Sequence, residues 1–188
     1  MNSPDGLAEN VLFLLHGLGD TSAPFHRLAS TMSLPQTACF SLQAPHPLPP
    51  DLGYSWFPIT VPELCEVSEA ETREGLRVAA ADLLAHVGAT MKTLGLSLDR
   101  AHLLGFSQGA AVALAAAVAV ADKAGSDDNG SCRLGSVCAV SVSSVSQVQQ
   151  LVDAAAAAQT KRGQNTNGRA GGGATHTPLL VLVKHQYC

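Results

Sequence analysis

The chain has 188 residues, of which 46% are hydrophobic and 14% charged, and its formal net charge at pH 7 is −4. This length is typical of a single folded domain, here residues 1–188, and the composition excludes an intrinsically disordered chain. No block of basic residues is present, so we expect no nucleic-acid partner. The longest apolar stretch, residues 110–121, falls short of the roughly 20 residues of a membrane span, so we expect no transmembrane segment.

The amino terminus and the cysteines bear on the compartment. Residues 1–6 lack the basic start of a signal peptide. The five cysteines are odd in number and widely spaced, which favours free thiols over a disulfide framework. We therefore expect a cytoplasmic protein.

The first half of the chain begins as an alternation of strands and helices. Residues 11–15 form a continuous apolar run, which predicts a central parallel strand covered on both faces. The run leads into His-Gly-Leu-Gly at residues 16–19, a loop that can turn backbone N–H groups towards one point. Residues 26–32 predict a short helix, and residues 38–42 a second strand.

The next segment, residues 44–58, contains five prolines, which predict a surface loop without regular structure. It carries Trp56, the only tryptophan of the chain, which either borders a ligand site or fills the core beneath the loop. Ser68 and Glu71 then form the pattern of a capping box and predict the start of a long helix, which Gly95 ends.

A Gly-x-Ser-x-Gly pentapeptide follows, with Ser107 at its centre between Gly105 and Gly109. Residues 101–104 predict a buried strand before it, and the alanine-rich residues 108–124 predict a helix after it. A nucleophile on so sharp a turn is held in a strained conformation, and side chains two residues away on either side would collide with neighbouring backbone. The pattern therefore predicts that Ser107 Oγ projects above the sheet, near the positive end of the helix that follows.

The remaining chain predicts a strand over residues 134–142, a helix over 147–159, a glycine-rich flexible insertion over 161–174 and a last buried strand over 177–183. Strands alternating with helices, each strand apolar on both faces, predict an α/β fold. Its sheet is expected to be mostly parallel, with helices on both faces.

Three motifs in this order give a specific resemblance: residues 15–21, the Tyr-Ser-Trp-Phe loop at 54–57, and residues 105–110. Together they resemble the acyl-protein thioesterase, lysophospholipase-like and carboxylesterase family of α/β-hydrolases. The likeness extends over about residues 11–183, because the strand that starts at Thr177 resembles the one before the family's catalytic acid.

The resemblance implies roles for four residues. Ser107 would attack an ester or thioester carbonyl and form an acyl-enzyme. The backbone N–H groups of Leu18 and Gln108 would form the oxyanion hole, and Trp56 would line the acyl side. The substrate would be an acyl ester or thioester, carried by a small molecule, a lysolipid or an acylated protein. No cofactor or metal is implied.

The chain departs from the family pattern after residue 183. The fold places an Asp and then a His beyond this point, but only five residues follow, so we expect a truncated domain lacking the last strand and helix. His185 could substitute as the base, although it lies where the acid belongs. We expect His16 to be a structural hydrogen-bonding group beneath its loop and His102 to face packing. His176, His185 and Cys188 match no metal-ligand spacing.

Three interpretations stay open at this stage. The chain is a serine hydrolase of esters or thioesters, a non-catalytic relative that binds acyl groups, or a truncated product that does not fold stably. Without the acid and the base, we expect very slow hydrolysis of p-nitrophenyl esters, and an incomplete sheet would expose apolar surface.

Overall fold

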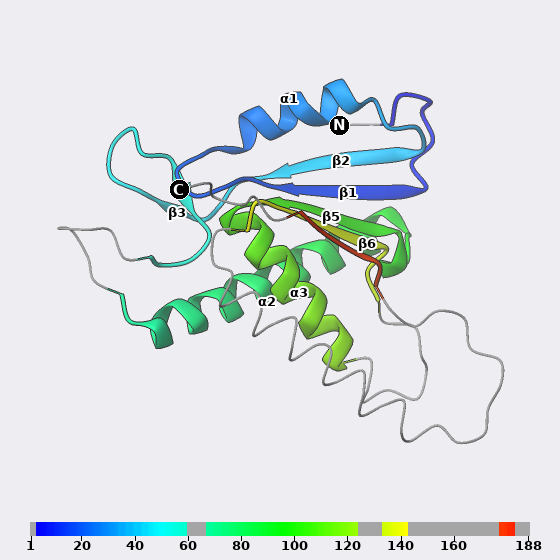
Figure 1. Cartoon of the computed structure of the whole chain (residues 1–188). Helices are drawn as coiled ribbons and strands as arrows, with labels where there is room; N and C mark the ends of the chain where they lie inside the picture. The colour runs from blue at the N-terminus through cyan, green and yellow to red at the C-terminus, as the bar shows by residue number, and fades with distance from the viewer. Residues whose placement is uncertain (1–2, 60–66, 124–132, 143–176, 183–188) are drawn as a thin grey trace, which may run out of the picture.

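The computed structural model describes residues 3–59, 67–123, 133–142 and 177–182. Its centre is a five-stranded sheet in the order β2-β1-β5-β6-β7, in which every neighbouring pair is parallel (Figure 1). The strands are β1 (Asn10–Leu15), β2 (Thr37–Leu42), β5 (Ala101–Phe106), β6 (Ser136–Val140) and β7 (Leu179–Leu182). The predicted parallel α/β architecture is confirmed.

Helices cover both faces of this sheet. Helix α1 (Ser22–Met32) packs on β1 and β2, whereas α2 (Glu69–Leu94) and α3 (Gln108–Lys123) lie on the other face and contact each other (Figure 1). A short 3-10 turn, η1 (Leu98–Arg100), leads into β5. The first helix starts four residues earlier than the pattern of apolar residues predicts.

Strand β1 shows why its sequence is apolar throughout. Phe13 and Leu15 belong to the large core cluster shared with α2 and α3, whereas Leu14 packs with Phe25 and Cys39 beneath α1. Successive side chains of a strand point to opposite faces, and here both faces are covered. A continuous apolar run is the result.

The ends of α2 are set locally, as predicted. The Glu71 N–H donates to Ser68 Oγ at 3.2 Å, and the Ser68 N–H donates to Glu71 Oε2 at 2.9 Å, which is the reciprocal pattern of a capping box. At the other end Gly95 has a φ of +69°, and its N–H donates to the Lys92 carbonyl at 3.2 Å.

The proline-rich segment differs from the prediction. It contains a small antiparallel hairpin of β3 (His46–Pro47) and β4 (Tyr54–Ser55), so the expectation of no regular structure was wrong. A proline can stand in a strand whose N–H is not needed for pairing. The bond that closes the hairpin is donated instead by Leu48, to the Gly53 carbonyl at 2.9 Å.

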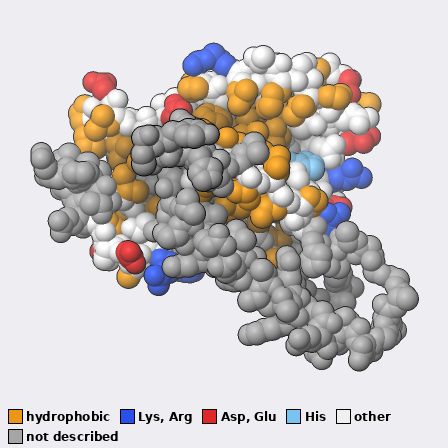
Figure 2. Space-filling view, in the orientation of Figure 1, with side chains coloured by type: hydrophobic (Ala, Val, Ile, Leu, Met, Phe, Trp, Pro, Cys, Tyr) orange, Lys and Arg blue, Asp and Glu red, His pale blue; other side chains and the backbone are white. Residues whose placement is uncertain are grey.

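Strand β7 forms within the predicted range, but the expectation that it is buried was wrong. Leu179 and Leu180 are 48% and 55% exposed. The strand stands at the end of the described sheet order, beside β6. In the view of Figure 2, hydrophobic side chains gather on the surface of the described part of the molecule.

Several predictions lie outside the described residues: the helix over 147–159, the insertion over 161–174 and the chain after residue 182. Within the described part of the chain, no helix combines the length and the apolar character required to cross a membrane.

Two glycines of α2 provide a matched test of the packing on this helix. A Cβ at Gly75 would lie 2.9 Å from Pro58 Cδ and 3.1 Å from Phe57 Cβ, whereas a Cβ at Gly88 would meet nothing within 4 Å. Gly75→Ala should lower the free energy of unfolding by about 1–3 kcal/mol through overpacking. Gly88→Ala should raise it by up to about 1 kcal/mol through helix propensity. Urea unfolding measures both, and changes of the same sign would contradict this packing.

Candidate active site

Ser107 occupies the turn between β5 and α3. Its φ is +51°, a left-handed value that non-glycine residues adopt rarely and at a cost of about 1 kcal/mol or more. The Ser107 N–H donates to the Val140 carbonyl at 2.9 Å. Its carbonyl accepts the N–H groups of Ala110 and Ala111 at 3.1 and 3.2 Å, so the helix begins directly at the serine.

The flanking glycines are required by close backbone approach. A Cβ at Gly105 would lie 2.4 Å from the Gly109 carbonyl oxygen. A Cβ at Gly109 would lie 2.5 Å from the His16 carbonyl oxygen and 2.6 Å from that of Leu15. Neither position has room for a side chain, as the Gly-x-Ser-x-Gly spacing predicts.

The loop after β1 lies beside this turn. Strands β1 and β5 are direct neighbours, with Leu15 opposite Gly105. A Cβ at Gly17 would lie 3.4 Å from Ser107 Cβ and 3.0 Å from the ring of Phe106. Leu18, the next residue, therefore belongs to the same end of the sheet as Ser107 rather than to an opposite edge.

Gln108 is the first residue of α3. The first N–H groups of a helix have no carbonyl partner within the helix, and the helix dipole is positive there. The Gln108 N–H is therefore suited to binding a negatively charged oxygen beside Ser107.

His16 is fully buried beneath the loop, and both of its ring nitrogens are used. The Nδ1–H donates to the Gly17 carbonyl at 2.7 Å, while Nε2 accepts the Ala44 N–H at 3.1 Å and lies 3.0 Å from the Gln43 amide nitrogen. Burial lowers the pKa of His16, and an Nε2 that accepts the Ala44 N–H carries no proton, so the ring is neutral in this arrangement. It is a structural group, as predicted, and not the base.

Trp56 is 6% exposed and lies against His16, with ring centroids 5.4 Å apart. Its indole N–H donates to the His16 carbonyl at 2.8 Å. The tryptophan thus fills the core beneath the loop, and it also borders a cleft on its other side. The core position is confirmed, and a role at a ligand site stays a prediction.

The side chain of Gln108 is the feature that sequence reasoning missed. It is 5% exposed, and its Oε1 accepts the Trp56 backbone N–H at 2.8 Å. Its Nε2 donates to Ser55 Oγ at 3.0 Å and to the Phe57 carbonyl at 3.1 Å. The available signal was a single polar residue before the long apolar run of residues 109–121.

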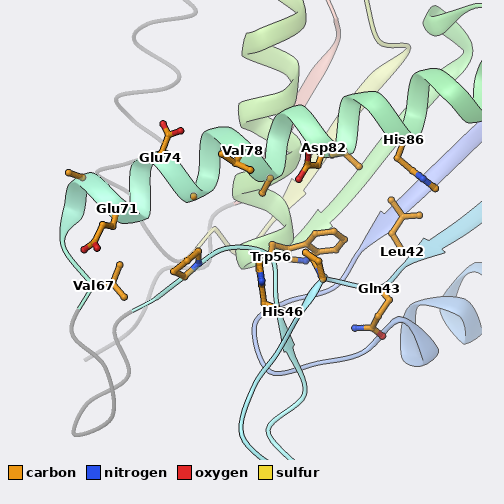
Figure 3. Close-up of a pocket in the computed structure, with 16 residues that line it drawn as sticks. Leu42, Gln43, His46, Trp56, Val67, Glu71, Glu74, Val78, Asp82 and His86 are labelled. Atoms are coloured by element: carbon orange, nitrogen blue, oxygen red, sulfur yellow. The ribbon is translucent and has the colours of Figure 1, made fainter.

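A cleft of about 1,040 Å³ opens between α2 and the hairpin (Figure 3). Apolar side chains, Trp56 among them, form much of its wall, and α2 adds three carboxylates, Glu71, Glu74 and Asp82. Ser107, Leu18 and Gln108 do not line it. Ser107, Gln108 and the Leu18 loop thus lie together at one end of the sheet. Trp56 contacts the Gln108 side chain and also lines the cleft.

His102 lies away from this site. It is the second residue of β5, whereas Ser107 follows the other end of the strand. Its Nδ1 lies 2.8 Å from Ser136 Oγ, and burial lowers its pKa. His176, His185 and Cys188 lie outside the described residues.

Sequence comparisons give one family and two curated relatives. A model of the phospholipase/carboxylesterase family matches residues 1–160. An uncharacterised hydrolase of Mycosarcoma maydis is 36% identical over 114 residues, which are 60% of this chain and 43% of the relative. An uncharacterised hydrolase of Schizosaccharomyces pombe is 30% identical over 108 residues, which are 56% of this chain and 44% of the relative. The chain spans less than half the length of these relatives.

Solved structures show the same architecture. Esterase PE8 aligns with a TM-score of 0.65 at 18% identity, over 98% of this chain and 86% of that one. A phospholipase/carboxylesterase from Dyadobacter fermentans aligns with a TM-score of 0.58 at 17% identity, over 97% of this chain and 84% of that one. Acyl-protein thioesterase 2 of Zea mays aligns with a TM-score of 0.52 at 19% identity, over 96% of this chain and 86% of that one. At these identities the similarity shows the α/β-hydrolase fold alone.

The buried neutral state of His16 predicts a pH dependence of stability. Because its pKa is lowered in the folded chain, the unfolded chain binds more protons below about pH 6.5, so folding weakens as the pH falls. His102 acts in the same direction. Urea unfolding at pH 7.5 and 5.5 should show lower stability at pH 5.5, with a smaller difference in His16→Gln and in His102→Gln. The exposed His26→Gln is the control; an unchanged difference in both test variants would contradict the assignment.

Proposed function

Because the chain belongs to the phospholipase/carboxylesterase family, we propose that it hydrolyses carboxylic esters or thioesters with Ser107 as the nucleophile. The turn at Ser107 carries the proposal. Its left-handed φ, its place between a strand and a helix, and two glycines without room for a Cβ are the features that a nucleophile elbow requires.

The reaction would proceed through an acyl-enzyme. Ser107 Oγ forms a bond to the carbonyl carbon of the substrate, and the carbon–oxygen or carbon–sulfur bond to the leaving group breaks. The hydroxyl proton passes through a base to the departing alkoxide or thiolate. Water then attacks the acyl-serine, releases the carboxylic acid and restores the serine hydroxyl.

The backbone N–H groups of Leu18 and Gln108 are the proposed oxyanion donors. Support comes from the neighbouring positions of β1 and β5 and from the contact distance between Gly17 and Ser107. Fixed N–H donors stabilise the charge that develops on the carbonyl oxygen, and each is worth about 3 kcal/mol of transition-state stabilisation.

The acyl group is proposed to lie on the Trp56 side of Ser107. Leu18 and Phe106, both 41% exposed, add apolar surface next to the nucleophile. An aliphatic acyl chain gains binding energy from such surface. Its carrier is a small molecule, a lysolipid or an acylated protein.

The cytoplasm is the proposed compartment. Cys138 is a free thiol among the described residues. Free thiols persist in a reducing environment.

His16 is excluded as the general base because both of its ring nitrogens are in hydrogen bonds, and His102 lies at the other end of β5 from Ser107. Binding of acyl groups without turnover is therefore the alternative function. The two differ in whether Ser107 forms a covalent adduct.

A fluorophosphonate probe tests the nucleophile directly. Mass spectrometry of the treated chain should show one phosphonyl group, and peptide mapping should place it on Ser107. Ser107→Ala should abolish the adduct. Ser30→Ala, which removes an exposed hydroxyl on α1, should retain it.

Adduct formation at other serines, or equal labelling of the Ser107→Ala variant, would contradict the nucleophile assignment. A folded wild-type chain that binds a fatty-acyl ester but forms no adduct at any probe concentration would favour the acyl-binding alternative.

A further inference from the structure

We propose that the side chain of Gln108 is a positioning group, which acts through residues 54–57 to hold in register the two loops that carry the proposed oxyanion donors. This inference rests on the proposed function for its catalytic consequence. It concerns the Gln108 side-chain amide, whereas the oxyanion is assigned to the backbone N–H of the same residue.

The Gln108 side-chain amide has a definite set of hydrogen-bond partners. The Ser55 hydroxyl donates to the Phe57 carbonyl at 2.5 Å and so receives, rather than donates, the bond from Gln108 Nε2 at 3.0 Å. The second amide proton goes to Phe57, and Oε1 accepts from Trp56. Both donors of a buried glutamine are thereby used, which fixes its orientation.

Residues 54–57 are also hydrogen-bonded to the loop after β1. The Gly19 N–H donates to the Tyr54 carbonyl at 3.0 Å, and the Tyr54 N–H donates to the Asp20 carbonyl at 3.2 Å. Next along the segment, the indole of Trp56 donates to His16. The segment therefore has hydrogen bonds to residues on both sides of Leu18.

The contact on this side is also sterically tight. A Cβ at Gly53 would lie 2.4 Å from the Gly19 carbonyl oxygen, so the two backbones touch where the segment begins. One stretch of chain thus joins the Leu18 loop by backbone bonds and the Ser107 turn by the Gln108 amide.

The consequence is a fixed distance between two N–H groups that come from different strands. An oxyanion hole works only if its donors are in place before the charge develops, and a misplacement of about 1 Å can cost roughly 100-fold in rate. Releasing the amide should therefore slow the chemical step and leave ground-state binding nearly unchanged.

The test compares three variants that all keep the backbone N–H of residue 108. Gln108→Met preserves the length of the side chain and removes its hydrogen bonds. Ser55→Ala removes one partner and is the milder change, for use if the first variant does not fold. Ser30→Ala, which deletes another hydroxyl-to-carbonyl bond on α1, is the matched control.

Two readouts are followed in each folded variant. The first is the labelling of Ser107 by a fluorophosphonate, separated into the maximum rate and the probe concentration that gives half of it. The second is hydrogen exchange of the indole N–H, which gives one NMR signal because the chain has one tryptophan.

In Gln108→Met the maximum rate should fall by about 10–100-fold, with the half-saturating concentration within about twofold of the wild type. Indole exchange should accelerate. Ser55→Ala should change the maximum labelling rate and the indole exchange rate in the same directions but by smaller factors. Ser30→Ala should change neither rate. The proposal would be overturned if the maximum rate stayed within about twofold of the wild type in both test variants. It would also be overturned if only the half-saturating probe concentration changed.

Failure of the proposed function gives a different result. If the wild-type chain is not labelled at all, the acyl-enzyme assignment is contradicted and the indole signal alone decides on the positioning role. Faster exchange in Gln108→Met and Ser55→Ala then supports it, and unchanged exchange overturns it.

Discussion

The contact that the site depends on is between the start of α3 and the end of β1. The backbone of Gly109 lies so close to the carbonyl groups of Leu15 and His16 that no Cβ fits between them. Two parallel strands that are neighbours in the sheet can thus bring their following loops into van der Waals contact. Ser107 and Gly17 become adjacent for this reason, and the chemistry proposed for the site requires that adjacency.

Buried polar groups hold the surroundings of that contact. His16, Ser55 and Gln108 are all buried, and among the described residues no buried side-chain nitrogen or oxygen lacks a hydrogen-bond partner. Satisfied polar networks specify one arrangement more sharply than apolar packing does, because an alternative arrangement leaves a donor or acceptor unpaired. The proline-rich segment is accordingly part of the framework of the site and not only a loop over it.

The sequence was sufficient where the cause is local. The capping box at Ser68, the end of α2 at Gly95 and the close approach of Gly105 to Gly109 each follow from the conformation of a few consecutive residues. It was insufficient where a partner lies far along the chain. The hairpin forms beside Asp20, and the Gln108 amide binds residues more than 50 positions away. Likewise, exposure of β7 depends on its neighbours in the sheet.

The central claim is that Leu18 and Gln108 present their N–H groups to one oxygen beside Ser107. A crystal structure of the chain with Ser107 phosphonylated tests it most directly, because the phosphonyl oxygen stands where the oxyanion would form. The account predicts that this oxygen lies within about 3 Å of both backbone nitrogens. A phosphonyl oxygen that points to solvent, or that contacts neither nitrogen, would contradict it.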